Sequence, residues 1–224
     1  MKYKKIIIIG TGGHSKSLIN LITSTNEFKI LGLIDNSISD KKILGYPILG
    51  TDKDLIKYYK KGIRYCAIGI GQIKSPYKRI KLFNLLKKIG FRIPTIISKK
   101  SECFKSNEIG EGTQIFHNTL INSNVKIGYN CIINSGSIIE HDVEISNNCH
   151  ISTRATVNGG VKIDENTFIG SGAIIKNNIQ IGKNCVIGMG TVVKKKLVME
   201  KFLNKKFIFF KNKFFQNMEL NNFL

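Results

Sequence analysis

The clearest pattern in the chain is an aliphatic residue at every sixth position from Ile109 to Val193. All of these residues are Ile or Val, and a small or β-branched residue follows four places after each repeat position. A period of six fits neither the 3.6-residue turn of an α-helix nor the two-residue alternation of a strand. It indicates a parallel β-helix, in which each coil buries its apolar side against the next coil.

Corners between the faces of such a coil need backbone with positive φ, which glycine and asparagine adopt more readily than other residues. Both are frequent within the repeat, and the glycines include Gly110, Gly128, Gly170, Gly182 and Gly188. A chance run in an isoleucine-rich chain does not keep register over this length. Residues 99–193 are therefore predicted to form an all-β domain of hexapeptide repeats.

Residues 1–98 alternate short apolar runs with amphipathic stretches. The runs at 4–9, 29–34, 64–70 and 92–97 are typical of buried parallel strands. Three helices are predicted between them: one with Leu18, Ile19, Leu21 and Ile22 on its apolar side, one opened by Asp52-Lys53-Asp54, and one over 76–89 closed by Gly90. This order predicts a Rossmann-like α/β domain with a parallel sheet and right-handed crossovers.

Ligands of such sheets bind beyond the carboxyl ends of the strands. These ends are predicted at the glycine loop 10–15, at Asp35-Asn36 and at Gly69–Gly71. Glycines let the backbone approach a phosphate, and an acid after the second strand can accept bonds from ribose hydroxyls. Ser15 replaces the third glycine of the dinucleotide fingerprint G-x-G-x-x-G, which favours a single nucleotide or a nucleotide sugar over NAD. A tight turn without a ligand is the alternative.

The net charge of +20 is concentrated in residues 1–108, while residues 109–193 are close to neutral. Nearly all of the positive charge is lysine, and no aromatic-and-basic motif or recognition helix accompanies it. This composition argues against nucleic acid as a partner. A positive field suits an anionic small substrate instead.

The five cysteines show no metal-binding spacing, so no metal is expected. Cys131, Cys149 and Cys185 fall at the small inward position of the repeat and are predicted to be reduced core residues. No stretch approaches the roughly 18–20 apolar residues of a membrane span. The four isoleucines near the start lead directly into a glycine loop, unlike a signal peptide. We therefore expect a cytoplasmic protein.

Five segments together resemble one family: GTGGHSKSL, LIDN, the GIG turn, INSGSIIEHD and NNCHISTRATVNGGVKI. They look like those of the sugar acetyltransferases of the sialic-acid acetyltransferase and bacillosamine-pathway type, over about residues 3–193. The resemblance implies a nucleotide-binding α/β domain joined to a left-handed β-helix. It also implies a homotrimer and transfer of acetyl from acetyl-CoA to a sugar.

The residues at the matching positions suit acetyl transfer. His141 matches the family's catalytic base, and imidazole is well suited to take a proton from an attacking amine or hydroxyl near pH 7. Asp142 matches an acidic neighbour that would fix the tautomer of that base. His150 matches a second histidine that faces the thioester, and Gly159 matches a backbone N–H donor to the thioester carbonyl oxygen. His117 is interpreted as a solvated corner residue.

The resemblance also implies binding residues. For the nucleotide-linked sugar these are Gly10, Gly12, Gly13, His14, Asp35, Asn36 and Asn134. For acetyl-CoA they are His150, Gly159, Ser171 and Met189.

Residues 194–224 depart from the family, whose members usually close with a Gly-x-Pro-Ala-Lys loop near the CoA. Here a Lys- and Phe-rich segment follows the repeats, without proline or glycine. It is interpreted as an amphipathic cap, a basic membrane-touching segment or the product of a reading-frame change. The completeness of the CoA site depends on which interpretation holds.

The predicted function is N-acetylation of a nucleotide-linked amino sugar in surface-glycan biosynthesis, with a histidine general base and direct attack on the thioester. The alternative is O-acetylation of sialic acid or a related sugar. A non-catalytic or C-terminally damaged protein and a nucleotide-sugar dehydrogenase are less favoured.

The spacing of two histidines predicts an active site shared between subunits. His141 and His150 are nine residues apart, which is half of an 18-residue coil in this family's architecture. They should lie on opposite sides of one β-helix, so a single acetyl group cannot meet both within one chain. A neighbouring subunit would supply the second histidine.

Overall fold

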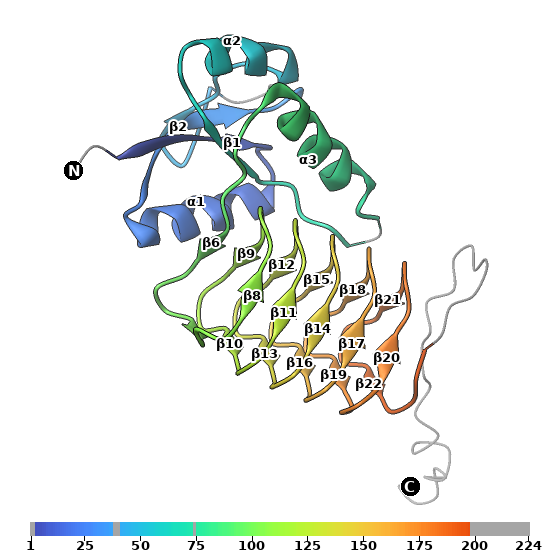
Figure 1. Cartoon of the computed structure of the whole chain (residues 1–224). Coiled ribbons are helices and arrows are strands. Elements are labelled where there is room, and N and C mark those ends of the chain that lie inside the picture. Colours follow the sequence, from blue (N-terminus) through green and yellow to red (C-terminus); the bar gives the residue numbers. More distant parts are fainter. Residues whose placement is uncertain (1–2, 38–40, 74, 198–224) are drawn as a thin grey trace, which may run out of the picture.

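A computed structural model of the chain describes residues 3–37, 41–73 and 75–197. An α/β domain sits against the side of a left-handed parallel β-helix (Figure 1). Most of the Lys- and Phe-rich tail, residues 198–224, lies outside the described residues. Within the described part of the chain, no helix has the length and apolar character needed to cross a bilayer.

The α/β domain is built on a parallel sheet with strand order β2-β1-β5. Its strands are β1 (Lys4–Ile9), β2 (Phe28–Ile34) and β5 (Tyr65–Ile68). Helix α1 (Gly13–Thr25) covers the face of the sheet that is turned to the β-helix, and α2 (Leu55–Lys60) and α3 (Tyr77–Ile89) cover the other (Figure 1). A 3₁₀ turn, η1 (Asp52–Asp54), and a hairpin of β3 (Lys42–Ile43) and β4 (Tyr46–Pro47) complete it.

The isoleucine run in β1 is explained by burial on both faces of the sheet. Ile6 and Ile8 belong to the cluster that contains α1, and Ile7 and Ile9 belong to the cluster that contains α2 and α3. A strand covered on both sides needs a continuous apolar run and not an alternation.

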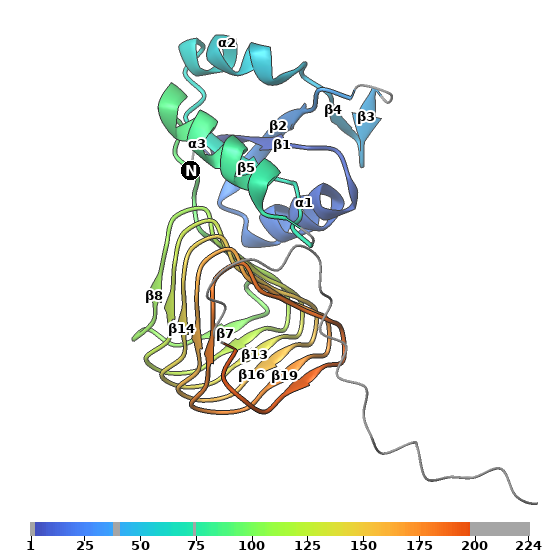
Figure 2. The ribbon, with the colours of Figure 1, turned by 90° about the vertical axis from the view of Figure 1, so that its right-hand side faces the viewer.

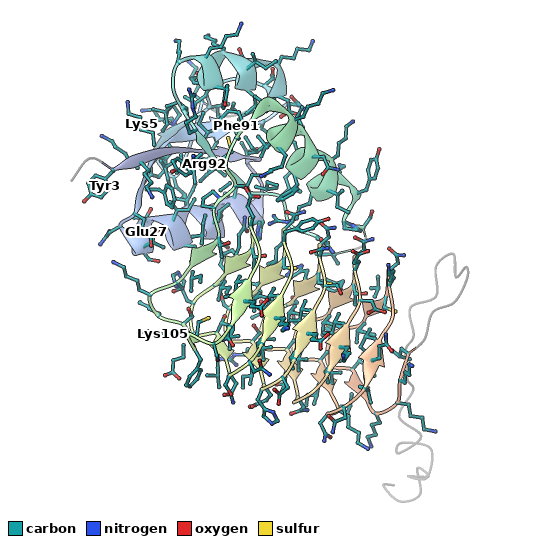
Figure 3. All side chains as sticks on the ribbon, viewed as in Figure 1. Tyr3, Lys5, Glu27, Phe91, Arg92 and Lys105 are labelled. Carbon is teal, nitrogen blue, oxygen red and sulfur yellow. The ribbon has the colours of Figure 1, made fainter. Side chains whose placement is uncertain are left out.

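The predicted strand over 92–97 is wrong as a single element of this sheet. Arg92, labelled in Figure 3, forms one parallel bridge with Tyr65 of the α/β domain, whereas Ile96–Ile97 pairs with the β-helix as β6. Pro94 lies between them, and because proline has no N–H it cannot continue the ladder.

The β-helix is triangular in cross-section (Figure 2), and its three sheets form three faces. The domain face, which meets the α/β domain, comprises β6 (Ile96–Ile97), β9 (Gln114–Ile115), β12 (Ile132–Ile133), β15 (His150–Ile151), β18 (Phe168–Ile169) and β21 (Val186–Ile187). The aliphatic face comprises β7 (Glu102–Cys103), β10 (Leu120–Ile121), β13 (Ile138–Ile139), β16 (Thr156–Val157), β19 (Ile174–Ile175) and β22 (Val192–Val193). The charged face comprises β8 (Glu108–Ile109), β11 (Lys126–Ile127), β14 (Glu144–Ile145), β17 (Lys162–Ile163) and β20 (Gln180–Ile181).

In the strands of the β-helix the second residue is the repeated aliphatic position, with Cys103 in its place in β7, and it points into one continuous core. The small position joins it, so Cys131, Cys149 and Cys185 are buried free thiols as predicted. Residues eighteen apart stack on each other because each coil pairs in register with the next, as Ile121 does with Ile139.

The corners use a different position from the one expected. Positive φ occurs at the third residue after each aliphatic position, for example Asn124 (φ 59) and Gly136 (φ 69). The glycines noted in the sequence lie one residue after the aliphatic position, and Gly110, Gly128 and Gly170 instead allow the next coil to pack closely. A Cβ on Gly110 would lie 2.5 Å from the backbone N of Tyr129.

The first residue of each strand points outward and gives its face a distinct character. On the charged face, Lys126 pairs with Glu108 and Lys162 pairs with Glu144. On the domain face, Ile132 and His150 are buried. The aliphatic face instead leaves apolar side chains open to solvent in this chain: Ile138, Ile174 and Val192 are 37%, 43% and 47% exposed.

Candidate active site

His141 and Asp142 form a hydrogen-bonded pair on the corner that joins the aliphatic face to the charged face, called here the histidine corner (residues 140–143 and the stacked turns 104–107, 122–125, 158–161 and 176–179). His141 Nδ1 lies 2.8 Å from Asp142 Oδ2. Because a carboxylate only accepts, Nδ1 carries the hydrogen and Nε2 presents a lone pair. Nε2 is therefore the atom that can take a proton.

The coil holds Asp142 in place from the preceding turn. The second carboxylate oxygen accepts a hydrogen bond of 2.6 Å from Asn124 Nδ2. The hydrogen bonds from His141 and then from Asn124 hold the pKa of Asp142 below its usual value. Asp142 sits at φ 60, a conformation that Asn occupies at most other corners and that Asp tolerates. The pair is open to solvent, with the His141 side chain 60% exposed.

Gly159 lies one coil beyond His141 and leaves room for its ring. A Cβ at Gly159 would lie 2.7 Å from His141 Cε1 and 2.8 Å from Nε2. Any side chain here must therefore displace the imidazole.

If His141 is the predicted base, replacing Gly159 by alanine should lower turnover by at least tenfold without unfolding the chain, because a displaced imidazole loses its alignment with the substrate. Gly188→Ala is the matched control, since the nearest atom to its added Cβ is 3.4 Å away. Steady-state rates of the two variants check this, with circular dichroism as the test of folding. Equal activity of both variants would contradict the positioning role.

The predicted nucleotide edge is assembled as expected at the ends of β1, β2 and β5. A Cβ on Gly10 (φ 107) would meet Ile70, so the glycine loop needs glycine there. Asp35 accepts hydrogen bonds from Thr11 Oγ1 (2.7 Å) and from the N (2.8 Å) and Oγ (2.7 Å) of Ser37. Burial opposes ionisation of Asp35, but these bonds outweigh it and its pKa lies below the usual value.

The first turn of α1 faces open space beside this edge. Gly12 is the N-cap residue without a side-chain cap, and a Cβ on Gly12 or Gly13 would contact nothing within 4 Å. Free N–H groups at an open helix start suit an anion such as phosphate. Asn36 is engaged within the chain, because its amide bonds both the backbone N and the carboxylate of Asp52.

His14 and His150 lie between the two domains. His14 Nε2 lies 2.9 Å from Gln114 Oε1, and Gln114 Nε2 donates to the carbonyl of Ile68. His150 Nδ1 donates to the carbonyl of Gln72, whose side chain donates to the carbonyl of Asn148. These contacts join the start of α1 and the end of β5 to the domain face.

His150, which the resemblance places facing the thioester, is covered within the single chain. His150 is only 5% exposed, and the ring of Phe168 packs edge-on against it at 5.1 Å. The repeat predicted the face on which His150 lies, but it did not show that the α/β domain of the same chain covers that face. His141 and His150 do lie on opposite sides of the coil, as predicted.

Asn134, Ser171 and Met189 line the opposite edge of the aliphatic face, on the corner that joins it to the domain face. Asn134 Oδ1 accepts from Ser135 N at 2.8 Å, and Ser171 Oγ lies 2.9 Å from Ser152 Oγ. Met189 is exposed. Within one chain the aliphatic face separates these three residues from His141.

Arg79 and Gln72 were not singled out from the sequence, although both anchor the domain contact. Arg79 is 1% exposed and bonds only carbonyl oxygens, those of Ile68 and Ile70 at 2.9 Å and more weakly those of Asn130 and Gly112. Burial lowers its pKa to about 10. The sequence did contain a sign of this role, because Arg79 is the one arginine in a helix whose other basic residues are lysines. A guanidinium carries several N–H donors in a fixed plane, so it can bond several carbonyl oxygens at once.

The buried histidines make stability fall in acid. Burial, and then the charge of Arg79, lower the pKa of His14 to about 3. Burial lowers the pKa of His150 to about 4, although its bond to Gln72 acts in the opposite direction. Unfolded imidazoles take up protons near pH 6.5, which the folded chain resists. Below pH 6.5 the free energy of unfolding should fall by about 1.4 kcal/mol per pH unit for each histidine.

Urea unfolding of the full chain at pH 7 and pH 5, at one protein concentration, measures this loss. His14→Gln keeps a donor for Gln114 and should remove about half of it. A free energy of unfolding that is unchanged between the two pH values would contradict the buried neutral state of both histidines.

Among residues 3–37, 41–73 and 75–197, no three His, Cys, Asp or Glu side chains are grouped so as to hold a metal ion. The candidate site thus far comprises three parts: the histidine corner, the predicted nucleotide edge and the contact between the domains.

Comparison with known proteins places the chain in one family. Residues 5–86 match the PglD N-terminal domain, and residues 142–177 and 160–195 match the bacterial transferase hexapeptide of six repeats. WeeI from Acinetobacter baumannii AYE is 30% identical, with a TM-score of 0.76, over 86% of this chain and 92% of that one. No curated protein sequence gives a significant match.

Two further structures are similar. A mutant of perosamine N-acetyltransferase from Caulobacter crescentus, solved with CoA and GDP-perosamine, is 28% identical with a TM-score of 0.82, over 86% of this chain and 90% of that one. The acetyltransferase domain of PglB from Neisseria gonorrhoeae shares the fold at 21% identity and a TM-score of 0.80, over 87% and 93% of the two chains. The chain belongs to the hexapeptide-repeat sugar acetyltransferases that carry a PglD-type N-terminal domain. Members of this family are enzymes that take the acetyl group from acetyl-CoA.

Proposed function

We propose that this protein transfers the acetyl group of acetyl-CoA to the amino group of a nucleotide-linked sugar. The observation that carries the proposal is the His141–Asp142 pair, whose geometry leaves the lone pair of Nε2 free. Gly159, one coil further on, leaves room for the imidazole ring. The Caulobacter enzyme, which is named for N-acetylation of perosamine and was solved with GDP-perosamine, supports the substrate class.

In the proposed reaction the sugar amine attacks the thioester carbonyl directly. His141 Nε2 takes the proton of the attacking nitrogen, and Asp142 stabilises the imidazolium that forms. The N–H of Gly159 would donate to the developing oxyanion. The attack forms the C–N bond, and collapse of the tetrahedral intermediate breaks the C–S bond, so that CoA leaves as the thiol with the proton returned by His141.

The nucleotide would bind along the edge of the α/β domain. The N–H groups at the start of α1 and the glycine loop suit its phosphates, and Asp35, already ionised, suits its ribose hydroxyls. His14 lies one residue beyond Gly13, and its bond to Gln114 leaves Nδ1 as an acceptor. We place the reaction in the cytoplasm, in the synthesis of surface-glycan precursors.

The active unit is proposed to be a homotrimer. The exposed His141 pair cannot exclude water by itself, and the aliphatic face leaves three aliphatic side chains partly uncovered. Three copies that meet through this face would bring the histidine corner of one subunit beside the Asn134, Ser171 and Met189 corner of the next. The groove between those corners would enclose the thioester.

Thiol release by the full chain tests the function. Acetyl-CoA is supplied with GDP-perosamine, with a UDP-linked amino sugar or with sialic acid. Turnover is expected with an amino sugar, and mass spectrometry should show an amide product. Turnover with sialic acid alone would favour O-acetylation. If none of the three acceptors gives thiol release, the proposed function is contradicted.

A further inference from the structure

Arg154 is an exception among the corners of the β-helix. Positive φ recurs at every sixth residue from Gly112 to Gly190, and each other residue in that position is Gly, Asn or Asp. Arg154 adopts φ 55 with a long side chain, a conformation that is unfavourable for such a residue. It is also the one arginine among residues 99–193. An unfavourable backbone conformation that presents a charged side chain points to a functional role.

The side chain of Arg154 runs along its corner toward the preceding coil. This is the corner that joins the domain face to the aliphatic face, which Asn134, Ser171 and Met189 also line. A Cβ on Gly136, one coil earlier, would lie 3.2 Å from Arg154 Cγ, so this glycine leaves room for the arginine stem. Arg154 is exposed, and within the described residues its guanidinium has no carboxylate at ion-pair distance.

A carboxylate without a cationic partner lies at the same height on the histidine corner. Coils stack about 4.8 Å apart, so Gly136 and Glu140 lie roughly 1 Å apart along the coil axis. Glu140 Oε2 accepts a hydrogen bond of 2.9 Å from Asn122, and no Lys or Arg of the described residues lies at ion-pair distance from it. Both oxygens of Asp142 already accept hydrogen bonds within the chain. Glu140 is therefore the carboxylate of this corner that is open to a cation.

We propose that Arg154 of one subunit forms an ion pair with Glu140 of the partner subunit and so fixes the groove between the two corners. The inference rests on the homotrimer of the proposed function, which brings these corners together at equal height. A guanidinium and a carboxylate form two parallel hydrogen bonds, so the pair sets both the distance and the orientation of the corners. His141 directly follows Glu140, so Arg154 is a positioning residue that holds the base of one subunit against the substrate of its neighbour.

Charge reversal tests the pair in the full chain. Arg154→Glu places two carboxylates together, and Glu140→Arg places two guanidinium groups together. Each should raise the protein concentration needed for assembly by at least about tenfold, because like charges at an interface repel. The double variant restores an opposite pair and should recover most of this loss. Sedimentation velocity over a dilution series measures assembly, and circular dichroism confirms folding.

Turnover separates positioning of the base from a contribution to assembly alone. Arg154→Gly relieves the backbone at φ 55, so the coil should fold at least as readily. Its turnover number should nevertheless fall by about tenfold, with KM for both substrates within about twofold of the parent, because the base is no longer held in register. Asn118→Gly, at the same corner position two coils earlier (φ 58), is the matched control and should change neither quantity.

The outcomes separate this pair from the proposed function. A raised KM for acetyl-CoA or for the nucleotide-linked sugar, with an unchanged turnover number, would make Arg154 a ligand contact and overturn the pair. Single reversals that assemble like the parent, or a double variant that assembles no better than either, would also overturn it. If the double variant rescues assembly but no acceptor gives thiol release, the pair stands and the acetyltransferase reaction fails. A monomeric parent would overturn the pair together with the homotrimer, while thiol release would still decide the reaction.

Discussion

Replacing His141 by alanine should lower the turnover number for acetyl transfer by roughly 10²–10⁴-fold, the usual contribution of a positioned general base. The fold should survive, because the side chain is 60% exposed and packs against the open surface of a glycine. The Kd for CoA should change little, since the lost interaction forms with the attacking amine and not with the donor.

Two further variants sharpen this test. Asn177→Ala removes an exposed side chain at the equivalent corner position two coils away and should keep full activity. Asp142→Asn keeps a residue suited to φ 60, which Asn occupies at Asn124 and Asn178, but removes the charge that stabilises imidazolium. It should therefore lose activity without losing stability.

The turnover number separates the base from a structural role, because His141→Ala should lose turnover while its circular dichroism stays that of the parent. Turnover of His141→Ala within twofold of the parent would remove the histidine from the mechanism.

Introducing aspartate at both Ile138 and Ile174 should separate the subunits of the proposed homotrimer and abolish activity. These isoleucines project from β13 and β19 of the aliphatic face and are 37% and 43% exposed in the single chain. Burying an isoleucine side chain contributes about 1.5–3 kcal/mol, whereas a buried unpaired carboxylate costs more than that. Each subunit of a trimer would place both substitutions in an interface, so the free-energy penalties of all three subunits add.

Gln180→Asp on the charged face is the matched control and should leave assembly unchanged. Sedimentation velocity measures the oligomeric state, circular dichroism confirms that each chain is folded, and thiol release measures activity. If the double variant assembles and turns over like the control, the aliphatic face is not the interface. If it is monomeric and fully active, the active site is complete within one chain.

The repeat by itself determined the β-helix, its core and the side of the coil on which each residue lies. This was possible because a stack of identical coils leaves a strict period of six in the sequence, so the aliphatic and small positions could be assigned inward without any long-range information. The half-coil separation of His141 and His150 followed from the same arithmetic. The isoleucine run and the glycine loop likewise identified β1 and the start of α1, because local burial and backbone conformation determine both.

Tertiary structure decided what depends on contacts between distant segments. The period does not distinguish the three faces, so only the packing of α1 and of the Gln72 loop showed that His150 is covered while the aliphatic face stays open. Arg79 bonds carbonyls from both domains, and no local pattern encodes such a contact. The strand expected over 92–97 divided between two sheets, because Pro94 interrupts it and each half found its partner in a different domain. These contacts depend on which surfaces pack together in the folded chain. The sequence determines the chemical character of each surface but does not show which other surface it contacts.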